Sequence, residues 1–135
     1  MQLNFKNLAV LSALLFFALA FTWMFAPKIL MASWGVDFSD SAGLVGRRGA
    51  ALYAGIGVMF FSARNAGPSL ARSSLVAGFV VTCLILAALG VVELVMGNVG
   101  SGILSAVFIE VALVFAFLYV SRASQNDLKT GSATR

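Results

Sequence analysis

VGSGILSAVFIEVALVFAFLYV, residues 99–120, carries a single charged side chain, Glu110, in a run of 22 residues. An apolar run of about 20 residues is long enough for a helix to cross the roughly 30 Å hydrocarbon core of a bilayer. A helix on the surface of a water-soluble protein would instead carry charged residues along one whole face. This stretch therefore predicts a helix that is surrounded by lipid and by other apolar helices.

The rest of the chain has the same character. Of its 135 residues, 61% are hydrophobic and 10% are charged, whereas soluble domains have about 45–50% and about 25%. A soluble fold of this length cannot cover so much apolar side chain. The composition predicts one all-α domain that is integral to a membrane.

Four apolar runs predict a four-helix transmembrane bundle over residues 1–120, with helices at about 8–26, 43–63, 73–96 and 99–120. The second run is the weakest, because Arg47 and Arg48 lie in its first turns. The first run could be a secretory signal, but its apolar character continues to Phe25, so we expect a retained helix. The polar tail, residues 121–135, is expected to be disordered and cytoplasmic.

The segment between the first two predicted helices, residues 28–42, is too apolar to lie in water. We expect a short interfacial helix here, with Trp34 and Phe38 in the headgroup layer. Ser39 or Asp40 is expected to cap the next helix.

Basic residues near the helix ends predict the orientation. Six of the nine lie on the side that holds both termini and the 64–72 connection, and three lie on the other side. The termini are therefore expected in the cytoplasm. Because the basic residues are scattered and form no stripe, membrane lipids are expected as partners and nucleic acid is not.

Two acidic residues of the predicted helices lie at different depths. With a rise of about 1.5 Å per residue, Glu93 lies about 5 Å and Glu110 about 15 Å below the 97–99 turn. Arg47 and Arg48 lie about 5–8 Å below the same surface, and the phenol of Tyr53 lies near the depth of Glu110. These five residues are the candidate binding residues, since an unpaired charge at the bilayer centre costs at least about 2.5–3.5 kcal/mol.

Depth alone leaves three interpretations of this polar cluster open. The acids and arginines could pair and hold the bundle in register, they could form a site for a ligand or a proton, or they could meet a helix of a partner. Small residues spaced four apart, such as Gly46, Ala50 and Ala54, permit close packing within the chain or in a homo-oligomer.

Several kinds of site find no support in the sequence. The chain has no histidine and one cysteine, Cys83, so the usual metal and haem ligands and the usual general base are missing. The glycines at 43, 46 and 49 follow no strand and precede no lysine, which excludes a phosphate loop of the Walker type. No catalytic residue, cofactor or metal is expected.

The pattern of the helices resembles a known group of proteins. It consists of Phe25-Ala26-Pro27 at the end of the first helix, an Arg48-led second helix rich in Gly and Ala, and the central Glu110 of the fourth. In this it is similar to the small four-helix bacterial inner-membrane proteins of unknown function, and more loosely to DoxX-like proteins. The resemblance implies a four-helix bundle with Arg48 and Glu110 as paired polar positions, and it supplies no activity. Many such proteins have Glu just before the second-helix Arg, where this chain has Gly46-Arg47.

Three functions are consistent with these observations. The first is a non-enzymatic accessory, assembly or structural role for a small membrane protein with a buried Glu/Arg cluster. The second is a transporter or binding protein for a small hydrophobic or cationic solute, as a dimer, with Glu110 as the ion- or proton-linked residue. The third is a subunit that docks on a larger membrane complex through its small-residue face.

Overall fold

The computed structural model describes residues 4–133 of the chain, and their side chains as far as Arg122. All the regular structure in this part is helical. The elements are α1 (Phe5–Phe25), α2 (Pro27–Ser33), α3 (Asp40–Ala63), α4 (Leu70–Val95), the short 3₁₀ helix η1 (Ser101–Ile103) and α5 (Leu104–Ala133). The all-α prediction is confirmed.

The helix boundaries follow from local capping chemistry. Side-chain oxygens of Asn4, Ser39 and Ser69 accept backbone N–H bonds at the first turns of α1, α3 and α4, at 2.9, 3.1 and 3.2 Å. Pro27 has no N–H and opens α2, so the chain turns between α1 and α2. The predicted cap of the second long helix is thus confirmed at Ser39.

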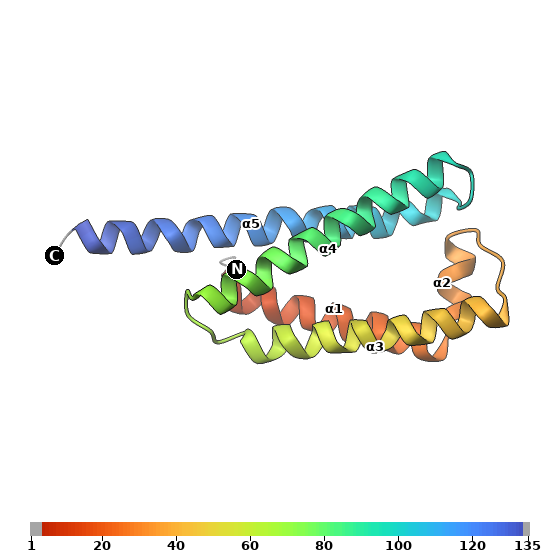
Figure 1. Cartoon of the computed structure of the whole chain (residues 1–135), viewed down its shortest axis with the longest axis horizontal. Coiled ribbons are helices and arrows are strands. Elements are labelled where there is room, and N and C mark those ends of the chain that lie inside the picture. The colour runs from red at the N-terminus through yellow and green to blue at the C-terminus, as the bar shows by residue number, and fades with distance from the viewer. Residues whose placement is uncertain (1–3, 134–135) are drawn as a thin grey trace.

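The four long helices form two antiparallel hairpins, α1 with α3 and α4 with α5 (Figure 1). The hairpins lie together near the N-terminus and part toward the opposite end, where α2 lies between them. We call this opposite end the α2 end. The α4–α5 turn lies there too, whereas the α3–α4 connection lies at the N-terminal end.

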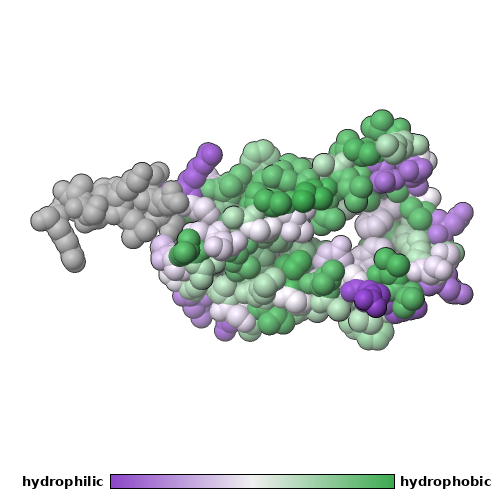
Figure 2. Space-filling model, viewed as in Figure 1, coloured by the Kyte–Doolittle hydropathy of each residue, from purple (hydrophilic) through white to green (hydrophobic). Residues whose placement is uncertain are grey.

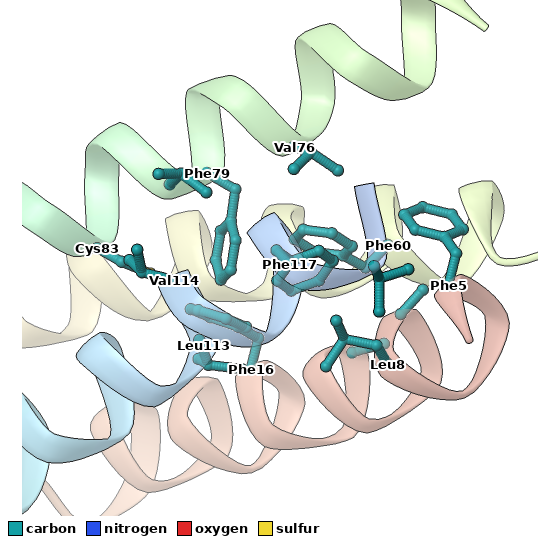
Figure 3. Close-up of a cluster of buried hydrophobic side chains, with 14 residues drawn as sticks. Phe5, Leu8, Phe16, Phe60, Val76, Phe79, Cys83, Leu113, Val114 and Phe117 are labelled. Carbon is teal, nitrogen blue, oxygen red and sulfur yellow. The ribbon is translucent and has the colours of Figure 1, made fainter. Parts of the chain in front are cut away.

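The N-terminal half is held together by aromatic rings from all four long helices (Figure 3). Phe60 and Phe117 are 0% exposed, and their ring centroids lie 5.1 Å apart. Phe79 packs edge-on against both, and Phe16 packs edge-on against Phe79 at 5.5 Å. We call Phe16, Phe60, Phe79 and Phe117 the aromatic plug, because they leave the N-terminal half closely packed.

At the α2 end, α2 is fixed to the α4–α5 turn by backbone contacts. The Gly100 N–H donates to the Trp34 carbonyl at 2.6 Å. Gly102 passes directly beneath Ser33, where a Cβ atom on residue 102 would lie 1.8 Å from the Ser33 carbonyl oxygen. Only glycine permits this approach, so α2 forms a roof over the space between the hairpins.

Three of the long helices are long and apolar enough to cross a membrane: α1, α4 and residues 101–122. Figure 2 shows that hydrophobic side chains cover most of the visible face between the two ends. The chain is therefore a membrane protein. Helix α3 is not apolar enough to join these three among the described residues, because Arg47 and Arg48 lower its hydropathy. Three of the four predicted apolar spans are therefore confirmed.

The last helix extends further than predicted. The sequence predicts its end near residue 120, followed by a disordered tail at 121–135, whereas α5 continues to Ala133. Residues 121–130 contain neither proline nor glycine, so no helix-breaking residue stops the helix there. The side chains beyond Arg122 and residues 134–135 lie outside the described part.

Candidate functional site

The space beneath the α2 roof is a cavity of about 200 Å³. We call it the deep chamber. Its floor includes Phe16 and Phe79 of the aromatic plug, and its roof includes Ser33 and Trp34 of the α2 region. All four long helices contribute to its walls, which are mostly apolar, as is usual for small-molecule sites.

A second cavity of about 280 Å³ lies toward the α4–α5 turn. We call it the turn-side chamber, since Val99 and Ile103 line it. The two chambers adjoin, because six residues line both: Trp23, Trp34, Tyr53, Leu86, Ala106 and Glu110. A third, more open cavity of about 530 Å³ lies between α2 and α3 and shares Trp23, Trp34 and Tyr53. The α2 half of the molecule therefore holds these three cavities, while a separate open one of about 380 Å³ lies at the α3–α4 connection, away from the aromatic plug.

Glu110 lies where the two chambers meet. Its Oε2 atom is buried and has no hydrogen-bond partner. A buried carboxyl oxygen without a partner is unfavourable by several kcal/mol if ionised, and nearly all such groups in proteins are bonded. An unpartnered carboxyl that faces a cavity is the arrangement expected of a group that binds something other than the protein itself.

The hydroxyl groups around Glu110 do not supply a partner. Ser33, Thr82 and Ser105 each donate to a carbonyl oxygen of their own helix, at 2.7, 3.0 and 2.7 Å. Their oxygen atoms can still accept, but their protons are used. The Tyr53 hydroxyl makes no hydrogen bond within the described residues. The Tyr53 side chain lines the same two chambers, and its ring centroid lies 5.8 Å from that of Phe16.

The two arginines do not close the site. Arg47 and Arg48 are exposed and line none of the three cavities. No ion pair joins them to Glu93 or Glu110 within the described residues. The acids and arginines therefore do not pair, although their depths permit it. The Arg48–Glu110 pair that the resemblance implies is not formed.

Helix rotation explains this difference. Gly46 lies against the Trp23 indole, Ala50 is buried, and Tyr53 lines the chambers, so these positions define the inward face of α3. At about 100° per residue, Arg47 projects roughly 100° and Arg48 roughly 200° from Gly46. Both guanidinium groups therefore point away from the interior, although they lie near the right depth.

Glu93 lines the turn-side chamber but not the deep chamber. It shares that chamber with Glu110, and its Oε2 accepts a 2.7 Å hydrogen bond from the exposed Asn98 side chain. Of the five residues predicted from the sequence, the structure thus brings together Glu110, Glu93 and Tyr53 and places the two arginines elsewhere.

Trp23 and Trp34 are further residues of the site, since each lines all three cavities. Trp34 was expected in the headgroup layer, and this position differs from that prediction. Their ring centroids lie 5.6 Å apart. Hydropathy could not reveal this, because the inward position of Trp34 depends on the Trp34–Gly100 backbone contact.

Comparison of the chain with protein-family models, with curated proteins and with solved structures found no match. The resemblance to DoxX-like proteins therefore rests on the sequence pattern alone.

The chemistry of the site follows from its lining. It offers one unpartnered carboxyl, one phenol and several aromatic faces in an apolar enclosure. Within the described residues no group of three or more His, Cys, Asp or Glu side chains could hold a metal ion. The arrangement can bind a small molecule through one polar contact and many apolar ones.

Proposed function

We propose that this protein binds a small, mainly apolar molecule within its membrane domain, as a binding protein or transporter, with Glu110 as the polar anchor. The observation that carries the proposal is the position of Glu110, whose buried carboxyl oxygen has no partner and faces two adjoining cavities. A purely structural Glu/Arg cluster would require an ion pair, and the arginines point outward.

The proposal includes four membrane-spanning helices, with α3 as the fourth. Its 24 residues extend about 36 Å, which exceeds a hydrocarbon core of about 30 Å. Arg47 and Arg48 lie near its start, where exposed arginine side chains can reach the headgroup layer. Helix α3 also packs along α1 over its length.

The proposed orientation has the N-terminal end in the cytoplasm of a bacterial inner membrane. Lys6, Arg64, Arg72 and Arg122 lie at this end, whereas at the α2 end three basic residues are offset by three acids: Lys28, Arg47 and Arg48 by Asp37, Asp40 and Glu93. Positive charge on the cytoplasmic side is the usual arrangement. The chambers then lie in the outer half of the membrane.

The test uses the tryptophans as reporters. The chain has two tryptophans, and both line the chambers, so their fluorescence responds to an occupant. The full chain in phosphatidylcholine nanodiscs is titrated with 4-phenylbutylamine and with 4-phenylbutan-1-ol. We expect a saturable change in fluorescence with at least one of them.

Two variants separate binding in the chambers from partition into lipid. Ala106→Leu places a larger side chain at the wall shared by both chambers and should abolish saturation. Ala112→Leu makes the same change at an exposed position of α5 and should leave the titration unchanged. A response that is linear with both molecules, and the same in all three proteins, would contradict the proposal.

A further inference from the structure

We infer that the molecule bound in the chambers is a lipophilic amine, whose ammonium group is held by Glu110. The inference rests on the proposed function and specifies its ligand. The first observation is the charge of the lining. Glu93 and Glu110 are the acids that line the deep and turn-side chambers, and no lysine or arginine lines either chamber.

The hydrogen-bonding character of the lining also favours a donor-rich ligand. Besides the two carboxyls, three hydroxyl oxygens face the deep chamber with their protons already donated to backbone carbonyls. These five groups accept, while the Tyr53 hydroxyl and the indole N–H groups of Trp23 and Trp34 can donate. An ammonium group has three donors and no acceptor, so it satisfies them, whereas an anion would meet two carboxyls and no cation.

The aromatic side chains near Glu110 suit the same charge. Trp23, Trp34 and Tyr53 line both chambers together with Glu110. A cation over the face of an indole or phenol ring is attracted by the ring electrons, most strongly when water is excluded. The apolar body of the amine would lie in the deep chamber, against Phe16, Phe79 and Leu113.

An amine that binds at this position replaces the carboxyl proton of Glu110. In the empty site a protonated carboxyl avoids an unpaired charge in an apolar enclosure. The ammonium group needs the ionised carboxylate, so the carboxyl proton leaves as the amine enters and the net charge of the site is unchanged. The other titratable groups that line the chambers are Tyr53 of α3 and Cys83 and Glu93 of α4, while α1 and the α2 region contribute none.

The experiment compares two probes of the same size, 4-phenylbutylamine and 4-phenylbutan-1-ol, by the same fluorescence titration at about pH 8. The amine is protonated there, as a lysine side chain is. We expect it to bind at least about tenfold more tightly than the alcohol, because a charge-assisted hydrogen bond replaces a neutral one. Glu110→Gln should remove that preference, because glutamine carries no charge to pair with the ammonium group, and Arg48→Gln, at an exposed position, should change neither affinity.

The pH dependence is a second measurement that needs no variant. Between about pH 8 and about pH 5 the amine stays protonated. Because its binding releases the carboxyl proton of Glu110, a higher proton concentration opposes binding, so the affinity for the amine should fall and that for the alcohol should stay constant. Equal affinity for the two probes in the native chain, or a preference that survives Glu110→Gln, would overturn the assignment and leave the proposed function intact. If neither probe binds saturably, both the assignment of an amine and the proposed function are overturned.

Discussion

At the scale of single residues, Glu110 and Arg48 show that depth in a membrane does not determine a contact. Both were expected in one polar cluster, and their depths allow it. Contact also requires that the side chains leave their helices toward each other. On α3, Gly46, Ala50 and Tyr53 occupy the inward face, so the arginines are directed outward. The carboxyl of Glu110 is left facing a cavity.

This geometry predicts the effect of Glu110→Gln and Arg48→Gln on stability. Breaking a buried ion pair costs about 3–5 kcal/mol, but Glu110 has no such partner to lose. Thermal unfolding in detergent should therefore show Glu110→Gln to be as stable as the native chain, or more so. In the double mutant the two effects should add to within about 0.5 kcal/mol. A coupling free energy of about 1–3 kcal/mol would show that the two side chains interact after all.

At the scale of elements, α2 and the α4–α5 turn determine whether the chambers are enclosed. Gly102→Ala would place a Cβ atom 1.8 Å from the Ser33 carbonyl oxygen, so α2 must move and the bond between Gly100 and Trp34 must lengthen or break. We expect a loss of roughly 1–3 kcal/mol of stability and greater quenching of Trp34 fluorescence by acrylamide. Gly78→Ala is the matched control. A Cβ at that position meets nothing within 4 Å, so the helix should gain up to about 1 kcal/mol. If the two variants behave alike, α2 does not depend on this contact.

The elements also show which parts of the fold the sequence can predict. The long apolar runs, the Ser39 cap and the short helix after Pro27 follow from local chemistry. Helices α1 to α4 begin within three residues of their predicted starts, whereas α5 begins five residues after its own. The roof does not follow in this way, because it depends on Gly100 and Gly102 meeting residues 33 and 34, which lie more than 60 positions earlier in the chain. Glu110 and Tyr53 could be predicted as candidate binding residues from their type and depth. The cavity between them could not be predicted, because it depends on the same contacts between distant positions.

At the scale of the whole molecule, packing is uneven along the length of the helices. The aromatic plug and its neighbours pack closely between the four long helices, whereas three adjoining cavities occupy the α2 half, and the remaining cavity lies outside the plug at the α3–α4 connection. The two hairpins therefore meet mainly through the plug. Stability should be concentrated there, and the α2 half is left free to change shape around an occupant.

The same substitution in each half tests this distribution. Leu8 is 6% exposed and belongs to the core cluster of the N-terminal half, while Leu86 is partly buried and lines both chambers. Leu8→Ala removes contacts on all sides and creates a new cavity, so thermal unfolding in detergent should show a loss of about 2–5 kcal/mol. Leu86→Ala only enlarges an existing space, because the side chain already lacks neighbours on the chamber side, and its cost should fall below that of Leu8→Ala. Equal costs would mean that the chambers are filled by neighbouring side chains in the folded protein, and the hollow half that holds Glu110 would then not exist as a binding site.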